Sequence, residues 1–69
     1  MLGEREAVVT EIRAFDLHGV TYYDVALTLS DGNAMSARLG PEAVPAGLEA
    51  GDPVLATLAA NMVVSLRRP

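Results

Sequence analysis

Hydrophobic residues recur at every second position over much of the chain, and a period of two predicts β-strands. In the segment 20–30 the apolar residues of one face are Tyr23, Val25, Leu27 and Leu29. Polar or small residues occupy the positions between them, which is typical of a strand with one buried face and one wet face. The segment 34–39 repeats the alternation. Because Asp31-Gly32 between the two segments tolerates the positive φ of a tight turn, the sequence predicts a β-hairpin here.

The segment 7–15 also alternates, but its apolar residues fall on both faces. Val9 and Phe15 lie opposite Val8 and Ile12. A strand that bends from one side of a barrel to the other would show this change of face. The residues 16–19 that follow are predicted to form a turn, because Gly19 supplies the dihedral angles that a tight turn needs.

The second half of the chain predicts one short helical turn and two further strands. Pro41 can open a single turn of helix, and Pro45 would end it. Residues 49–52 then form a tight turn into a strand at 54–60, and a last strand covers 62–67. Asn61 joins these two strands, since asparagine suits a left-handed turn position.

Five short strands without a long crossover predict an all-β fold in one domain spanning 1–69. We expect a five-stranded small barrel, closed or partly open, of the OB or SH3-like kind, with at most one short helical turn. The sequence does not choose between these topologies. A chain of 69 residues with no cysteine has a small core and no disulfide, so assembly into a homo-oligomer is a further expectation.

Charge and hydropathy limit the classes of partner. Nine acidic residues outnumber five arginines, lysine is missing, and the net charge is -4. This balance argues against binding to nucleic acid and to anionic membranes. The longest apolar stretch, 54–66, is shorter than the roughly 20 residues of a spanning helix, and the N-terminus has no apolar signal region. We therefore expect a cytoplasmic protein without membrane insertion.

The residues that usually carry catalysis do not form a recognisable site. His18 is the single histidine and lies in the polar turn at 16–19, where a solvated role is expected. The three serines, Ser30, Ser36 and Ser65, have no Gly-x-Ser-x-Gly setting. The glycines are spread out and form no phosphate-binding loop. The sequence therefore predicts no enzyme activity, no catalytic residue, no metal site and no cofactor.

Apolar positions on the outer side of the predicted strands suggest a protein interface. Tyr22 lies on the face opposite Tyr23, and an exposed tyrosine can anchor a subunit contact. The strands at 54–66 are apolar on both faces, and a small barrel buries only its inner face. We therefore take Tyr22, Leu55 and Val63 as candidate interface residues, with a second copy or another protein as the partner.

The run 31–39, followed by Gly47-Leu48-Glu49-Ala50-Gly51-Asp52-Pro53-Val54, resembles the TOBE and molbindin family. The resemblance covers residues 6–66 loosely and 31–64 more closely, and residues 56–64 match the closing strands. These domains are small barrels that lie at the ends of ABC-transporter ATPases or form free-standing oxyanion-binding oligomers. The resemblance implies a non-enzymatic binding module for a small oxyanion, or a transporter-associated accessory domain.

The resemblance also implies candidate ligand residues. Molbindins hold molybdate through backbone amides, hydroxyls and a lysine. Here Ser36 keeps a hydroxyl, Arg38 and Gly40 stand where further serines are expected, and Ala59 stands at the lysine position. The candidate anion ligands are Ser36, Arg38 and Asn61. Two alternatives stay open: a barrel that acts only through protein contacts, and an OB-like nucleic-acid binder suggested by Arg67-Arg68.

Overall fold

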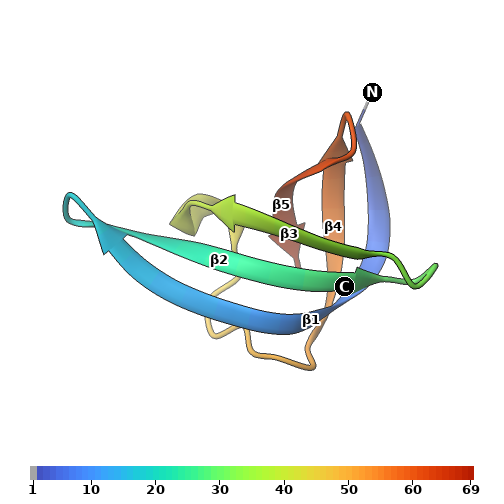
Figure 1. Ribbon diagram of the computed structural model, residues 1–69, viewed down its shortest axis with the longest axis horizontal. Helices are drawn as coiled ribbons and strands as arrows, with labels where there is room; N and C mark the ends of the chain where they lie inside the picture. The colour runs from blue at the N-terminus through green and yellow to red at the C-terminus, as the bar shows by residue number, and fades with distance from the viewer. Residues whose placement is uncertain (1) are drawn as a thin grey trace.

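The computed structural model describes residues 2–69 and contains a single five-stranded antiparallel sheet (Figure 1). The elements are β1 (Leu2–Leu17), β2 (Val20–Leu29), β3 (Ala34–Leu39), the 3-10 turn η1 (Pro41–Ala43), β4 (Pro53–Ala59) and β5 (Met62–Arg67). The strand order is β3-β2-β1-β4-β5. The predicted all-β fold, its five strands and its single short helical turn are confirmed.

The sheet is curved but does not close into a barrel (Figure 1). β1 is long enough to pair with β4 through its first half and with β2 through its second half. The two edge strands, β3 and β5, contact each other, but no ladder of the described residues pairs them. Of the two predicted forms, the closed barrel is therefore not confirmed.

β1 is longer than the sequence pattern predicted. The predicted start at Ala7 was wrong, because residues 2–8 pair in register with β4 from Ala59 back to Pro53. The polar side chains of this stretch are exposed, as expected for the outer face of a strand. Glu4 forms an ion pair with Arg67 at the C-terminal end of β5. Polar residues in this part of the chain thus belong to a strand with a wet face.

A β-bulge in β1 explains why its apolar pattern changes face. Ala7 and Val9 are buried before the bulge, and Ile12 packs against the core after it. The register with β2 shifts between Val9 and Glu11, so one extra residue reverses the alternation. The backbone amide of Gly51 donates to the Val9 carbonyl at 2.7 Å and fixes the bulge from the other side. The predicted change of face is confirmed.

Two hairpins close through residues with left-handed backbone. His18 and Gly19 have φ of 52° and 80°, and Ala60 and Asn61 have φ of 50° and 65°. Two consecutive positive φ values define the turn that matches the right-handed twist of a hairpin. The predicted turn roles of Gly19 and Asn61 are confirmed. Ala60 adopts this conformation although it carries a Cβ atom, which is unfavourable.

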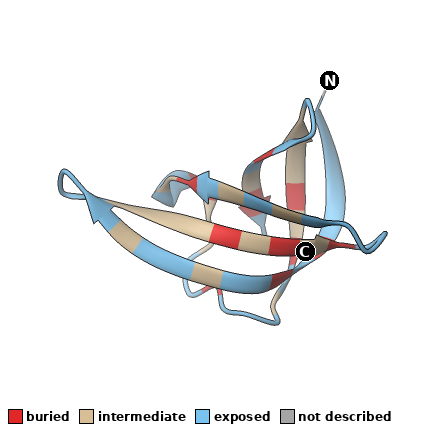
Figure 2. Ribbon diagram, in the orientation of Figure 1, coloured by how far each residue is buried: buried red, intermediate tan, exposed pale blue. Residues whose placement is uncertain are grey.

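The core is small and aliphatic (Figure 2). Twelve hydrophobic residues are buried and no described polar residue is. The largest fully buried side chains are those of Leu27, Val9 and Val54. Tyr23 packs against this core from β2, as the alternation predicted. With so few large side chains, the domain has little stability to spare.

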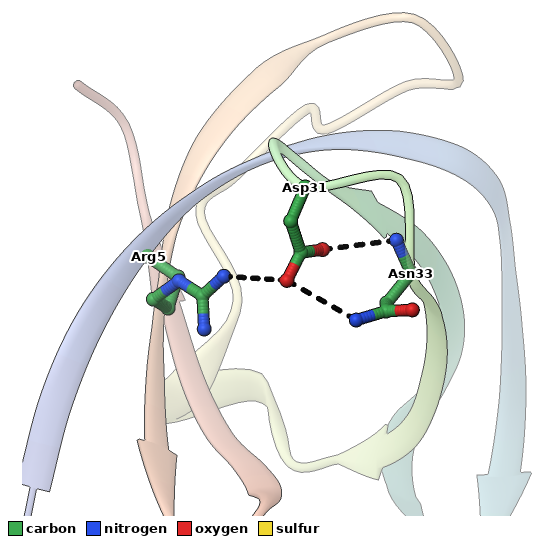
Figure 3. Close-up of polar contacts among 3 residues, drawn as sticks. All are labelled: Arg5, Asp31 and Asn33. Atoms are coloured by element: carbon green, nitrogen blue, oxygen red, sulfur yellow. Dashed lines mark hydrogen bonds and ion pairs between the residues drawn. The ribbon is translucent and has the colours of Figure 1, made fainter.

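A polar cluster fixes the β2–β3 turn to β1 (Figure 3). The Asp31 carboxylate accepts hydrogen bonds from the backbone amide of Asn33 at 2.9 Å and from the Arg5 guanidinium at 2.8 Å. These two hydrogen bonds, the backbone one first, lower the pKa of Asp31. The cluster therefore adds a side-chain tie between β1 and the turn that closes the predicted hairpin.

Candidate functional site

Ser36 and Arg38 lie on the outer face of β3 and line one open hollow of about 500 Å³. The register between β2 and β3 sets Ala26 opposite Ser36 and Asp24 opposite Arg38. Glu11 of β1 completes the rim. The hollow therefore holds one hydroxyl, one guanidinium and two carboxylates.

Arg38 forms a two-point contact with Asp24. Its Nε donates to Oδ1 at 2.9 Å and its Nη2 donates to Oδ2 at 3.4 Å. The Arg38 side chain is 66% exposed, so water weakens this pair. The hydrogen bond from Arg38 lowers the pKa of Asp24, and the same contact raises the pKa of Arg38. Asp24 is thus ionised and occupies the donors that an external anion would use.

Aromatic side chains support Arg38 from β1 and β2. The guanidinium carbon of Arg38 lies 4.6 Å from the centre of the Phe15 ring. Phe15 in turn stacks on Tyr22, with ring centres 5.9 Å apart. Tyr22 is half-buried by this contact rather than fully exposed. A cation held over an aromatic face keeps its planar fork in one orientation.

Asn61, the third candidate anion ligand, lies in another part of the molecule. It occupies the β4–β5 turn and lines a shallow hollow with Arg5 of β1. Neither Ser36 nor Arg38 lines that hollow. The structure therefore brings two of the three predicted anion ligands together and leaves Asn61 apart from them.

Three other arginines also form ion pairs with carboxylates. Arg5 pairs with Asp31 at 2.8 Å, Arg67 pairs with Glu4, and Arg68 lies 3.7 Å from Asp52. The bond from Arg67 lowers the pKa of Glu4. Within residues 2–69, four of the five arginines are therefore paired with carboxylates, all but Arg13. Arg67-Arg68 forms no basic surface of the kind that nucleic acid requires.

The three interface candidates occupy different environments. Tyr22 is half-buried on the outer face of β2. Leu55 is also half-buried and lines an apolar hollow of about 660 Å³ with Val8 and Pro53. Val63 is only 6% exposed and belongs to the core, because the bulge in β5 turns its side chain inward. The neighbouring Val64 is 43% exposed instead.

Residues 2–69 hold no group of three or more histidine, cysteine, aspartate or glutamate side chains that could bind a metal ion. None of the helical segments described is long and apolar enough to cross a membrane.

Comparison with protein families gives the decisive observation. The model of the TOBE domain matches residues 5–64. The chain belongs to the TOBE family. The resemblance predicted from the sequence is thereby confirmed, and this TOBE domain is a member of a family of small binding and accessory domains. No curated protein and no solved structure matches the chain.

Sequence reasoning missed the two residues that hold Arg38 in this TOBE domain, Asp24 and Phe15. The sequence did contain a signal for Asp24, namely the predicted hairpin turn at Asp31-Gly32. The positive φ of Gly32 and the bond from the Leu29 amide to the Asn33 carbonyl fix the hairpin register. That register sets Asp24 across from Arg38. Phe15 had no comparable signal, because its contact depends on how β1 follows β2 after the bulge.

Proposed function

We propose that this TOBE domain is a non-catalytic binding module for a small tetrahedral oxyanion. The ligand lies in the hollow between β2 and β3, where Ser36 and Arg38 provide the donors. The observation that supports the proposal is that these two side chains line the same open hollow. The family membership supports the ligand class, since TOBE domains are associated with molybdate- and transport-related proteins.

The chemistry of the two donors suits an oxyanion. A guanidinium presents parallel N–H groups that match two oxygens of an anion, and a hydroxyl adds a third hydrogen bond. Ser36 and Arg38 are separated by one residue on a strand, so both side chains leave the same face of β3. Phe15 holds the guanidinium in place beside the hollow.

Asp24 acts as an internal competitor in this proposal. Its carboxylate already occupies Nε and Nη2 of Arg38. An exposed ion pair of this kind contributes about 0–1 kcal/mol. Displacing it therefore weakens anion binding by at most about fivefold. A dianion with higher charge density than a carboxylate can replace Asp24 on Arg38, while the Asp24 carboxylate stays at the rim of the hollow.

Thermal melting of the purified chain tests the proposal. Molybdate, tungstate, sulfate and phosphate are each added at millimolar concentration, with sodium chloride matched for ionic strength. We expect one oxyanion to raise the melting temperature selectively through ligand linkage. Arg38→Ala should abolish the shift, and Arg68→Ala, which removes an exposed arginine elsewhere, should keep it.

A wild-type chain that shows no shift with any of the four anions would overturn the oxyanion function. That outcome would favour the alternative expected from the sequence, a barrel that acts only through protein contacts. A shift that survives in Arg38→Ala would show that an anion binds away from the β2–β3 hollow.

A further inference from the structure

A row of side chains from three strands lines the β2–β3 hollow. Glu11 of β1 lies opposite Ala26 of β2, and Ala26 lies opposite Ser36 of β3. Ile12, the neighbour of Glu11, packs against the core, so the Glu11 side chain lies on the outer face. Neighbouring strands are about 4.8 Å apart, which separates the backbones of Glu11 and Ser36 by about 10 Å. The methyl group of Ala26 between them leaves this space open, and all three residues line the hollow.

The two sides of the hollow differ in hydrogen-bonding character. On the β3 side, Ser36 offers a hydroxyl and Arg38 offers a guanidinium, and both groups donate. On the β1 side stands the Glu11 carboxylate, which only accepts when it is ionised. Within residues 2–69, this carboxylate takes part in no ion pair and no side-chain hydrogen bond. Arg13, the nearest cation on the same strand face, lies opposite Asp24 and does not line the hollow.

We infer that the β2–β3 hollow selects tetrahedral oxyanions that carry a proton, such as inorganic phosphate, and that Glu11 makes this selection. The inference rests on the proposed oxyanion function and names the class of anion that the site takes. Hydrogen phosphate has bare oxygens that accept from Ser36 and Arg38, and it has a P–OH group that donates to the Glu11 carboxylate. Donors and acceptors of the anion and of the hollow then match on both sides.

Fully deprotonated oxyanions lack this match. Near neutral pH, sulfate, molybdate and tungstate carry no proton, so each of their oxygens is an acceptor. Beside Glu11, such an oxygen would face a second acceptor that also carries negative charge. A site that hydrogen-bonds one group of a ligand rejects a ligand without that group, because the site's own polar atom is left unpaired. Glu11 is exposed, so water reduces this penalty, and we expect discrimination of about tenfold, below that of buried sites.

The same chemistry distinguishes free phosphate from the phosphate groups of larger molecules. A phosphomonoester loses its second proton with a pKa of about 6, and a phosphodiester has no second proton to lose. In slightly alkaline buffer both therefore present only acceptors, whereas inorganic phosphate keeps a proton. Methyl phosphate then has the same charge as hydrogen phosphate and differs from it by a methyl group in place of that proton. A comparison of the two anions tests the role of the proton at constant charge.

Isothermal titration in slightly alkaline buffer of matched ionic strength tests the inference. Inorganic phosphate should bind the wild-type chain about tenfold more tightly than sulfate or methyl phosphate. Glu11→Gln replaces the carboxylate by an amide that both donates and accepts, so sulfate should bind this variant more tightly and the preference for phosphate should fall to about twofold or less. Glu6→Gln is the matched control and should keep the preference, because Glu6 is another exposed glutamate of β1 that does not line the hollow.

The possible outcomes separate the selection for a proton from the proposed oxyanion function. If sulfate, molybdate or methyl phosphate binds the wild-type chain as tightly as inorganic phosphate, the oxyanion function stands and the selection for a proton is refuted. A preference for phosphate that persists in Glu11→Gln, or that is lost equally in Glu6→Gln, would refute the role of Glu11. If none of these anions binds the wild-type chain, both the selection and the oxyanion function are refuted.

Discussion

Replacing Asp24 by asparagine should strengthen oxyanion binding. The substitution keeps the size of the side chain and removes the charge that holds Arg38 at 2.9 Å. Two effects add. Without the exposed ion pair between Asp24 and Arg38, the anion no longer has to break that pair, and this strengthens binding by about 0–1 kcal/mol. Loss of a negative charge about 4 Å from a bound anion removes about 1 kcal/mol of repulsion in a watery site.

The sum of about 1–2 kcal/mol corresponds to an increase in affinity of about 5- to 30-fold. Isothermal titration with the oxyanion that shifts the melting temperature measures it, with wild type and Asp24→Asn compared in the same buffer. Glu4→Gln is the control, because it removes a carboxylate from the exposed pair with Arg67 and does not touch the β2–β3 hollow. Equal or weaker affinity in Asp24→Asn would refute the role of Asp24 as a competitor.

Three further predictions concern stability. Ala60→Gly relieves the left-handed backbone at φ 50° and should raise the melting temperature by about 2–8 °C; an unchanged value would contradict the strain argument. Leu27→Ala, at a position only 2% exposed, should cost about 2–5 kcal/mol in urea unfolding, which is a large share of the about 3–10 kcal/mol expected for a domain of this size; a loss below about 1 kcal/mol would contradict the assigned core. The pKa values of Glu4, Asp24 and Asp31 are lowered in the folded state, so ionisation of these groups stabilises the fold. This stabilisation is fully present at pH values above the ordinary pKa values of 3.8 to 4.5, and it is lost as the pH falls through the lowered folded values. When the pH is lowered below about 4, the melting temperature should therefore fall. The melting temperature of Asp31→Asn should fall less steeply than that of the wild type.

Local sequence signals were sufficient for most of the fold. The alternation at Tyr23, Val25 and Leu27 follows from one buried face, and the structure buries or packs all three. The turns at Gly19, Gly32 and Asn61 all have positive φ, a property that depends on the residue and its immediate neighbours. Such features need no information from distant parts of the chain.

Features that depend on partners across the sheet could not be predicted in the same way. β1 starts at Leu2 because β4 pairs with it, and no local signal in Glu4 or Glu6 shows this. Val63 is buried because the β5 bulge shifts the alternation by one residue. A bulge reverses every assignment of inner and outer face beyond it, which is why a period of two alone misplaces such a residue.

In the candidate site, too, some features follow from the local sequence and others depend on residues that are distant in the sequence. Ser36 and Arg38 share a hollow because they share a strand face, which alternation predicts. Asn61 is separated from them because the β4–β5 turn lies near Arg5, a contact between residues far apart in the sequence. The neutralisation of Arg38 by Asp24 depends on the hairpin register and not on either residue alone.

Nuclear magnetic resonance titration of the isotope-labelled chain tests the central claim most directly. The oxyanion that raises the melting temperature is added stepwise, and both backbone amide and arginine Nε signals are followed. The account predicts that the largest changes occur at Ser36, Ala37 and the Arg38 Nε, with smaller ones at Asp24. Changes confined to Arg5 and Asn61, or no changes at any site, would contradict an oxyanion site between β2 and β3.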